Sequence, residues 1–349
     1  MKKKNSTAQP KKVKLNSKYL EDPKIKKIYL IFKKTLFSQI KNKEFCVGVS
    51  GGPDSLALAF LSKIFSREFN SKFIALIVNH NLRKQSGIEA QKIKKILTKH
   101  KIKAKILAWK GKIPNSNIQY NARNIRYYLL NKECDRCNIK YLVLAHHEGD
   151  LIENFFIRLF RGSGLKGLSS LNIKRYSESN DLNIIRPFLN TKKGELIYIA
   201  KKVFKFYLID PLNFEEKFLR TRIRNYLNKF KLDGLDINKV KLTLGNLQSA
   251  NESIDFYKEK SIKNYVRYLL HNSCFVGYDL FNHESKEVIF RTISDIISKV
   301  SDKYYPPRGK NVNNLITRMQ SKKFKKSTLG GCIIEKSYNF FIFKKEFKI

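Results

Sequence analysis

Acidic residues are scarce in this sequence. Among its 349 residues, Asp and Glu total 29 against 71 Lys and Arg, so the formal net charge is +42. A positive charge of this size attracts polyanions and raises the rate at which they meet the protein. Nucleic acid is therefore the leading partner, because Lys and Arg drive its binding by neutralising phosphates. Biased composition is the alternative explanation, since the chain is also rich in Ile, Asn, Phe and Tyr.

Cysteine is also rare. The five cysteines stand at irregular spacings, at Cys46, Cys134, Cys137, Cys274 and Cys332. This usage excludes a disulfide framework and is typical of a reducing cytosol. Cys134 and Cys137 form a lone C-x-x-C pair, whereas a structural zinc site normally needs four ligands. We therefore interpret the pair as two ordinary positions of a helix rather than as a zinc or redox site.

Long apolar runs are missing as well. No stretch approaches the roughly 18 apolar residues that a membrane helix requires. Seven Lys and no acidic residue occur by position 18, but no apolar segment follows directly, so we predict no secretory signal. We expect a cytoplasmic protein whose residues 1–22 form a basic disordered tail that touches RNA. A weak organelle-targeting segment is the alternative for this tail.

Short apolar runs alternate with longer amphipathic stretches along most of the chain. Strands are predicted at 45–49, 73–78, 104–109, 141–145 and 183–189, and helices at 55–65, 87–100, 117–137, 150–160 and from 191. Strands that alternate with helices predict an α/β fold, in which helices cover both faces of a parallel sheet. Ligands of such sheets bind at the carboxyl ends of the strands.

The pattern changes near Gly234, which interrupts it. A long Lys-rich helical region is predicted over 238–270, and the segments beyond Cys274 are strand-like and irregular. We predict a catalytic domain over 23–233 and an accessory region over 234–349 that is mainly helical and then α+β. This region holds two notable segments, Tyr304-Tyr305-Pro306-Pro307-Arg308-Gly309 and Leu329-Gly330-Gly331-Cys332. Their aromatics beside basic residues are suited to stacking on unpaired bases, or equally to core packing.

The segment Ser50-Gly51-Gly52-Pro53-Asp54-Ser55 is the strongest functional signal. It follows a predicted strand and opens a predicted helix. Glycines let the backbone approach a phosphate, and the helix N-terminus presents free N–H groups to the anion. Asp54 is out of place in a simple anion cradle, but it suits a loop that helps to hold Mg²⁺. The segment lacks the Lys of a Walker A loop, and the alternative interpretation is a tight capped turn.

Further motifs accompany this loop between residues 46 and 224. They are Val78-Asn79-His80-Asn81-Leu82-Arg83, Ala145-His146-His147-Glu148-Gly149-Asp150-Leu151-Ile152-Glu153-Asn154, Arg158-Leu159-Phe160-Arg161-Gly162-Ser163-Gly164-Leu165-Lys166-Gly167-Leu168, Arg186-Pro187, Asp210-Pro211 and Arg220-Thr221-Arg222-Ile223-Arg224. Taken together with the loop, these segments resemble the PP-loop ATP pyrophosphatase superfamily and, within it, the tRNA(Ile)-lysidine synthase family. The resemblance implies the PP-loop fold and cleavage of ATP between its α and β phosphates.

The implied reaction has two steps and uses ATP, Mg²⁺, free L-lysine and the tRNA(Ile) with a CAU anticodon. In the first, O2 of the wobble cytidine, position 34, attacks the α-phosphate of ATP and pyrophosphate leaves. In the second, the ε-amine of lysine attacks C2 and AMP departs. The product, lysidine, pairs with A, so that AUA is read as isoleucine.

The motif positions supply the expected site residues. We expect ATP to bind Ser50, Gly51, Gly52, Pro53, Asp54 and Ser55, catalysis to involve Asp54, His146, His147, Asp150 and Glu153, and Mg²⁺ to bind Asp54 and Asp150. We expect tRNA to contact His80, Arg83, Arg123, Arg126, Arg158, Arg161 and Arg222, because Arg suits phosphate recognition. The alternative for the arginines, Arg220 and Arg224 included, is a solvated face or local ion pairs.

Two positions depart from the family pattern. Asn79 replaces the usual Asp, and Gly149 stands where the family usually has an acid. Gly cannot bind metal through a side chain, so either Asp150 suffices or Glu148 compensates.

Two rival functions remain open. A tRNA thiolation enzyme would need sulfur-carrying cysteines at the site, but Cys134 and Cys137 are predicted away from the carboxyl ends of the strands. A non-catalytic RNA-binding relict would explain the loss of the acid at position 149.

Overall fold

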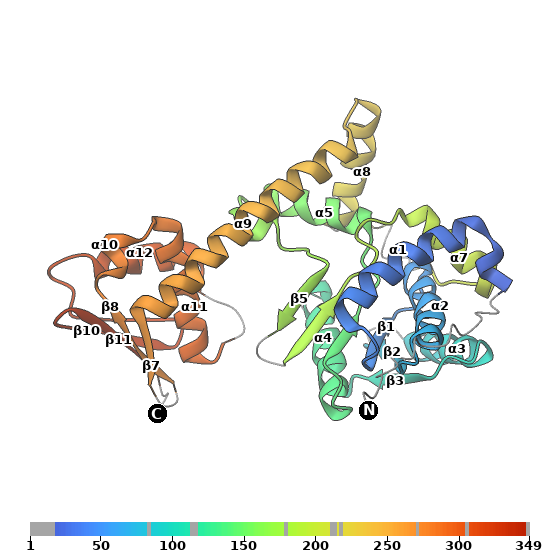
Figure 1. Cartoon of the computed structure of the whole chain (residues 1–349), viewed down its shortest axis with the longest axis horizontal. Coiled ribbons are helices and arrows are strands. Elements are labelled where there is room, and N and C mark those ends of the chain that lie inside the picture. The colour runs from blue at the N-terminus through green and yellow to red at the C-terminus, as the bar shows by residue number, and fades with distance from the viewer. Residues whose placement is uncertain are drawn as a thin grey trace, which may run out of the picture. The chain divides into compact units, whose positions relative to one another are not determined.

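The structure, a computed structural model, describes residues 18–81, 85–111, 118–177, 181–209, 215, 219–269, 272–303 and 307–346. The chain divides into two compact units, residues 1–240 and 241–349 (Figure 1). No helix within these described ranges is long and apolar enough to cross a membrane. Each unit is described separately below.

The first unit is built on a six-stranded sheet in the order β3-β2-β1-β4-β6-β5. Its strands are β1 Phe45–Val49, β2 Phe73–Asn79, β3 Ala104–Ala108, β4 Tyr141–Val143, β5 Lys174–Ser177 and β6 Leu182–Ile185. Its helices are the short 3-10 turn η1 Lys18–Glu21, then α1 Pro23–Ile40, α2 Pro53–Glu68, α3 Ser86–Lys99, α4 Ile118–Arg136, α5 Glu148–Leu159, α6 Leu165–Leu168, α7 Lys193–Phe204 and α8 Leu219–Leu232. All strand pairings are parallel except that of β5 with β6, so the predicted parallel sheet is confirmed with one antiparallel edge strand.

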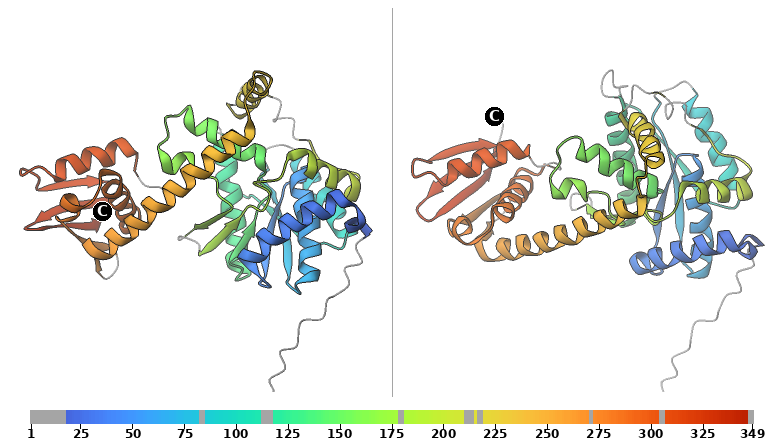
Figure 2. Two further views of the ribbon diagram at one scale, coloured as in Figure 1. Left: turned by 45° about the horizontal axis from the view of Figure 1, so that its top comes forward. Right: turned by 90° about the horizontal axis from the view of Figure 1, so that it is seen from above.

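Helices cover both faces of this sheet, as predicted (Figures 1 and 2). On β1, Val47 and Val49 belong to the core that includes α1, α2, α3 and α7. Cys46 faces the other way, into the core that includes α4. A strand buried on both faces needs an almost continuous apolar run, which explains why β1 and β2 stand out in the sequence.

Helix α1 shows how local chemistry sets an element and ties it to a neighbour. Asp22 caps it, accepting hydrogen bonds from the N–H groups of Lys24 (2.9 Å) and Ile25 (3.3 Å), and Pro23 begins the helix. The other carboxylate oxygen of Asp22 accepts from Lys202 Nζ (2.8 Å) and Tyr198 Oη (2.6 Å) on α7. These hydrogen bonds, that from Lys202 first, hold the pKa of Asp22 below its ordinary value.

The chain order of the strands places the functional edge. From β1 the chain runs outward through β2 to β3, and it then returns through α4, on the opposite face, to β4 beside β1. The carboxyl ends of β1 and β4 therefore lie next to each other at the point where the winding reverses. Open α/β sheets bind ligands at such a switch point.

The second unit carries a five-stranded antiparallel sheet in the order β7-β8-β11-β10-β9. Its strands are β7 Val266–Leu269, β8 Ser273–Gly277, β9 Lys326–Leu329, β10 Cys332–Ser337 and β11 Phe340–Lys345, and its helices are α10 Leu280–His283, α11 Lys286–Ser301 and α12 Gly309–Met319. Helix α9 Ile237–Tyr265 begins in the first unit and continues into the second. Residues of α11 and α12 share one buried core with alternate residues of the sheet, such as Cys274, Ile334 and Phe343. The predicted change to a long helix followed by α+β structure is confirmed.

A tight hairpin joins β9 to β10 through Gly330 and Gly331. Both have positive φ, +66° and +90°, which suits a two-residue turn and favours glycine. A Cβ on Gly330 would lie 2.6 Å from Cγ of Pro307 and 2.9 Å from Cγ2 of Ile297. Pro307 therefore packs against the hairpin at Gly330. Tyr304, Tyr305 and Pro306 lie outside the described residues.

We expect Gly330→Ala to lower the free energy of unfolding by about 1–2 kcal/mol, because it combines a strained φ with a close contact. The matched control is Gly245→Ala on α9, where a Cβ would meet nothing within 4 Å. This second change is expected to stabilise by about 0.5–1 kcal/mol, because Gly is unfavourable inside a helix. Thermal unfolding of both variants measures the difference, and equal midpoints would contradict the expectation.

Candidate functional site

The loop between β1 and α2 is held by Ser55. Its buried Oγ accepts hydrogen bonds from the N–H groups of Ser50 and Gly51, both at 3.1 Å, and lies 3.0 Å from the carbonyl oxygen of Gly52. Gly51 has φ +87°, and a Cβ there would lie 2.5 Å from Cδ1 of Ile93. The first helical hydrogen bond of α2 runs from Leu56 N–H to the Gly52 carbonyl. The earlier amides of α2 are therefore left for a ligand, as at other phosphate-binding helix N-termini.

Asp54 lies in the first turn of α2 and is largely buried. One oxygen, Oδ1, is buried and has no hydrogen-bond partner in the described structure. The other, Oδ2, lies 3.8 Å from Nε2 of His147. Burial raises the pKa of Asp54 despite the opposing charges of His147, Lys193 and Arg224. A buried carboxylate with an unsatisfied oxygen is costly to keep, which indicates that it has a ligand to bind.

His147 is the N-cap residue of α5, and its side chain reaches toward two carboxylates. Its ring Nδ1 accepts a hydrogen bond from the backbone N–H of Gly149 at 2.9 Å. The backbone N–H of His147 donates to Oδ2 of Asp150 at 3.0 Å. Because Nδ1 is an acceptor, the neutral ring carries its proton on Nε2. Nε2 lies 3.8 Å from Oδ2 of Asp54 and 3.7 Å from Oδ2 of Asp150. The structure thus brings together Asp54, His147 and Asp150 from the ends of neighbouring strands.

Gly149 has a structural reason to lack a side chain. A Cβ at this position would lie 2.7 Å from Cε1 and 3.1 Å from Nδ1 of His147. The imidazole therefore occupies the space that an acidic side chain at position 149 would enter first. In this chain, the lack of a side chain at Gly149 fits the way His147 caps α5.

We expect Gly149→Ala to displace the His147 ring from its capping position. The lost cap should cost about 1 kcal/mol of stability, and the misplaced imidazole should slow the reaction about tenfold. Gly194→Ala in the first turn of α7 is the matched control, since a Cβ there meets nothing within 4 Å. Unfolding and turnover of the two variants are to be compared. An unchanged rate in Gly149→Ala would show that the ring position does not matter.

Two arginines of α8 hold the acidic residues of α5. Arg220 donates to Oδ1 of Asp150 and to Oε2 of Glu153, both at 2.6 Å. Arg224 donates to Oε1 of Glu153 at 2.5 Å and to Oε2 at 3.2 Å. Burial raises the pKa of Asp150, but the charges of Arg220 and of the two neighbouring histidines outweigh this effect and hold the pKa at about 2. These two arginines therefore form local ion pairs, the alternative that the sequence left open for them. Their i,i+4 spacing places them on one face of α8.

His146 and His80 follow β4 and β2 along the chain, and both side chains are partly buried. Desolvation lowers the pKa of His146 to about 3 and, together with Arg126, that of His80 to about 4. Both rings are therefore neutral at physiological pH. Nδ1 of each is buried and has no hydrogen-bond partner in the described structure.

Asn79 has a local role in the turn after β2. Its Oδ1 accepts the N–H of Asn81 at 3.0 Å, and Asn81 has a positive φ of 54°. A carboxylate would accept the same hydrogen bond. The turn after β2 therefore survives the loss of charge.

The arginines expected to contact tRNA are exposed where the structure describes them. They are Arg123, Arg126, Arg158, Arg161 and Arg222, whereas Arg83 lies outside the described residues. Arg126 Nη2 lies 3.4 Å from Nε2 of His80, and the Arg123 guanidinium lies 5.0 Å from the ring centroid of Tyr127. Arg222 is exposed on α8 between the two arginines that bind carboxylates.

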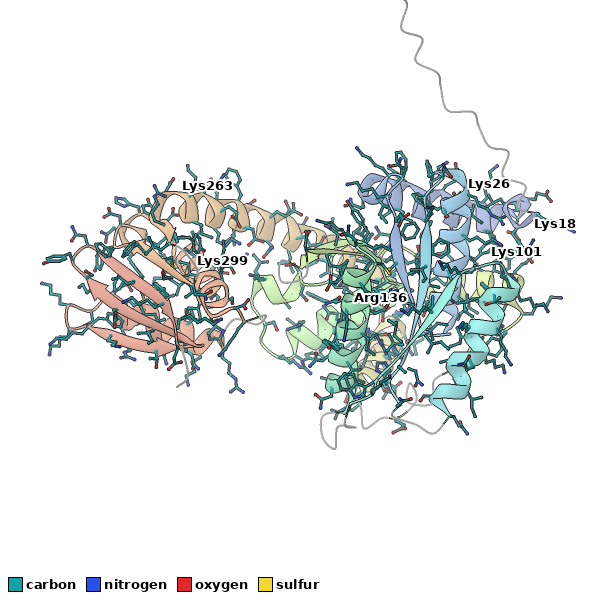
Figure 3. All side chains as sticks on the ribbon, turned by 90° about the horizontal axis from the view of Figure 1, so that it is seen from below. Lys18, Lys26, Lys101, Arg136, Lys263 and Lys299 are labelled. Carbon is teal, nitrogen blue, oxygen red and sulfur yellow. The ribbon has the colours of Figure 1, made fainter. Side chains whose placement is uncertain are left out.

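The cysteines of α4 lie far from this site in the fold. Cys134 is buried in the core with Cys46, and the contact with Cys46, together with burial, raises its pKa. Cys137 lies near Glu133, which binds Arg136 (labelled in Figure 3) and Lys105. The end of α4 precedes β4, so it lies at the amino edge of the strands. Among the described residues, no group of three or more His, Cys, Asp or Glu could hold a metal.

A small pocket opens beside the carboxylates, between α5 and α8. Its lining residues combine acidic, basic and apolar side chains: Glu148, Gly149, Ile152, Glu153, Arg224, Leu227, Asn228, Lys231 and Ile237. Mixed charges around an apolar floor suit a small zwitterion with an aliphatic chain. Sequence reasoning missed α8 as a wall of this pocket.

Comparison with known proteins gives consistent results. The PP-loop domain family matches residues 24–230. The tRNA(Ile)-lysidine synthase of Orientia tsutsugamushi is 33% identical over 320 residues, which are 88% of this chain and 70% of the relative. That of Wolbachia pipientis is 32% identical over 307 residues, 86% of this chain and 70% of the relative. A solved U34-tRNA thiolase of Methanococcus maripaludis has a TM-score of 0.57 at 19% identity, covering 66% of this chain and 81% of the thiolase. This last likeness supports the fold alone.

Proposed function

The chain belongs to the tRNA(Ile)-lysidine synthase family of PP-loop enzymes, and from this premise we propose its reaction. It ligates free lysine to C2 of the wobble cytidine, position 34, of the CAU-anticodon tRNA(Ile). The reaction consumes ATP through an adenylylated tRNA and lets AUA be read as isoleucine. The observation that carries the proposal is the meeting of a phosphate-binding loop with Asp54, His147 and Asp150 at one sheet edge.

The ATP half of the site is the loop Ser50–Ser55. The N-terminal amides of α2 would bind the phosphates, and Gly51 lets the backbone make its turn without a clash. The buried Oδ1 of Asp54, which lacks a partner, fits a Mg²⁺ ion carried by ATP. Asp150 is the second candidate ligand, although Arg220 and the His147 N–H engage its oxygens here. Such an ion would supply charge neutralisation at the leaving pyrophosphate.

In the first step, O2 of the cytidine would attack the α-phosphate of the ATP. The bond to pyrophosphate breaks, and the loop amides and Lys193 would stabilise the charge that develops there. The charge of Lys193 already acts on Asp54, so its ammonium is near the loop. His146 and His80, which are neutral, are the candidate groups to orient the cytidine.

In the second step, lysine would occupy the pocket between α5 and α8. Its α-carboxylate would meet Arg224 or Lys231, and its methylenes would pack on Ile152 and Leu227. The free ε-amine has a pKa of about 10.4 and must lose a proton before it attacks C2. The positive charges of Arg220 and Arg224 and a desolvated pocket would lower that pKa. Asp150, Glu153, His146 and His147 are the candidate proton acceptors.

The tRNA would lie across the exposed arginines around the site. Arg123, Arg126, Arg158, Arg161 and Arg222, with Arg83, would bind phosphates, and the accessory region 234–349 would hold the tRNA body. Affinity for tRNA should therefore fall steeply with salt, as it does when several phosphates are neutralised. The proposed substrates also place the enzyme in the cytoplasm.

Incubation with ATP, Mg²⁺, labelled lysine and tRNA(Ile) tests the proposal. We expect lysine-dependent release of AMP and a labelled nucleoside with the mass of lysidine at position 34. Transfer of sulfur instead would identify a thiolation enzyme. Binding of tRNA without ATP turnover would identify a non-catalytic relict, and either outcome would overturn the proposal.

A further inference from the structure

The sheet of the second unit ends at strand β9, which pairs with β10 on one side only. The N–H of Lys336 in β10 donates to the carbonyl oxygen of Lys325 at 2.9 Å. Because every second residue of an antiparallel pair exchanges such bonds, Ser327 also turns its backbone groups toward β10. The N–H and C=O groups of Lys326 and Thr328 therefore point away from β10, where a further strand would pair.

An open pocket lies along this edge, between β9 and helix α12. Leu315 of α12 and Leu329 of β9 supply its apolar lining, and Arg318 Nη1 donates to Ser327 Oγ at 3.2 Å. The other lining residues are polar: Asn311, Asn314 and Thr328. Side chains of a strand point alternately to the two faces of a sheet. A strand added beside β9 would therefore direct every second side chain to the face that α12 covers, where the pocket can receive one of them.

The part of the chain around this edge carries charge of one sign. No Asp or Glu occurs between Asp302 and Glu335, whereas eight basic residues do: Lys303, Arg308, Lys310, Arg318, Lys322, Lys323, Lys325 and Lys326. Five of them are exposed on or beside β9 and the pocket, namely Arg318, Lys322, Lys323, Lys325 and Lys326. Any strand that pairs with β9 therefore meets a row of positive charges.

The acid nearest in the ladder does not offset this charge. Glu335 of β10 lies opposite Lys326 and is already paired with Lys326 (2.9 Å) and with Lys344 (3.2 Å). Lysines on an edge strand keep unselected strands from pairing with it. The same lysines attract a strand that carries acidic side chains, because complementary charge decides which partner binds. The edge is therefore selective for an acidic strand.

We propose that the β9 edge binds an extended acidic peptide segment of another protein, which would join the sheet as an added strand. Its main chain would pair with Lys326 and Thr328, one apolar side chain would enter the pocket, and its acidic side chains would meet the surrounding cations. The proposed function requires no such partner, so this inference goes beyond it.

Two other occupants fit the edge less well. In a second copy of this chain, the β9 edges would bring like charges together and repel each other. RNA is anionic, but its backbone has no alternating N–H and C=O groups to pair with a strand. Among the described residues, moreover, the pocket lining includes no aromatic ring on which a base would stack. Charge and main-chain geometry together therefore favour a peptide.

Two fluorescein-labelled peptides test the inference on the full chain by fluorescence anisotropy. The first alternates Glu and Val over eight residues. The second has the same sequence with its central backbone N–H groups methylated, which keeps the charge and the side chains but removes main-chain donors. We expect the first to bind and the second to bind about tenfold more weakly, because hydrogen bonds to β9 are lost. No binding of the first peptide, or equal Kd values for the two, would overturn the inference.

Variants of the chain locate the binding edge. Thr328→Pro removes the outward N–H at an edge position where proline is tolerated, and it should weaken binding of the first peptide about tenfold. Thr328→Val keeps that N–H and should bind as the wild type does. Arg318→Gln should weaken binding about threefold, whereas Lys263→Gln, an exposed charge on α9 (labelled in Figure 3), should not. The methylated peptide is tested on the wild type, so the result does not depend on the fold of the proline variant.

Two further measurements separate the peptide from the other occupants. Lysidine formation and the Kd for tRNA should be unchanged in Thr328→Pro. A weaker Kd for tRNA with unchanged peptide binding would identify an RNA surface, and self-association of the wild type that Thr328→Pro abolishes would identify a second copy. Either result would overturn the inference. If the wild type binds the peptide but forms no lysidine, the proposed function fails while this inference stands.

Discussion

Asp54→Asn is expected to slow AMP transfer to tRNA about 100- to 1000-fold, which corresponds to about 3–4 kcal/mol of transition-state stabilisation. The change keeps the size of the side chain and removes its charge. Asp54 lies in the first turn of α2, beside the proposed phosphate loop, and its buried Oδ1 has no hydrogen-bond partner in the described structure, so the loss should appear in the first chemical step. Single-turnover release of pyrophosphate measures that step directly.

The same substitution should leave the fold as stable as the wild type or make it more stable. Burial raises the pKa of Asp54 above its ordinary value of 3.8, so the folded state holds this proton more tightly than the unfolded state does. As pH rises from 3.8 through the folded pKa, ionisation of the buried carboxylate destabilises the wild type. Asparagine does not ionise, so the variant should gain in relative stability over this range.

Asp135→Asn, an exposed position on α4, is the matched control for the loss of a carboxylate. It should change neither the rate of AMP transfer nor the pH dependence of the free energy of unfolding. If Asp54→Asn retained the full rate, the phosphate loop would not use this carboxylate, and the assignment of Mg²⁺ to it would be wrong.

Arg220→Ala is expected to lower the free energy of unfolding at neutral pH by about 2–3 kcal/mol. Arg220 binds both Asp150 and Glu153, and Glu153 is only 5% exposed. Removing one partner from a buried ionic group leaves the other charge uncompensated, which costs about 3–5 kcal/mol when the pair is fully buried. The smaller value applies because the Arg220 side chain is 39% exposed. Denaturant unfolding gives the difference.

The pH dependence of this loss has a definite sign. Arg220 helps to hold the pKa of Asp150 at about 2, below its ordinary value of 3.8. The stability that this shift contributes is present above pH 3.8 and is lost as pH falls toward 2. Wild type and Arg220→Ala should therefore converge in stability over that acidic range.

Arg222→Ala provides the control on the same helix. Arg222 is exposed between the two arginines that bind carboxylates, so its removal should change stability by no more than about 0.5 kcal/mol. A loss in Arg222→Ala as large as that in Arg220→Ala would show that α8 responds to any lost charge, and not to the ion pairs with α5.

The alternation of apolar runs and amphipathic stretches by itself determined the first unit's architecture. The predicted strand at 45–49 is β1, and the predicted strand at 73–78 is β2 with one more residue. The fourth strand ends at Val143 rather than at the predicted Ala145. The antiparallel β5 was not predicted, because an edge strand need not be apolar on both faces. The resemblance to the tRNA(Ile)-lysidine synthase family is confirmed by relatives about one third identical.

Tertiary structure decided which of the charged and polar residues meet. The sequence placed Asp54 and Asp150 after two different strands, but only the sheet order made those strands neighbours. The role of Arg220 and Arg224 depends on α8 packing against α5, and the reason for Gly149 depends on where the His147 ring lies. Local sequence sets backbone propensity and the pattern of burial over a few residues. Contacts between side chains some 70 residues apart are set by how the elements pack, and no local pattern encodes them.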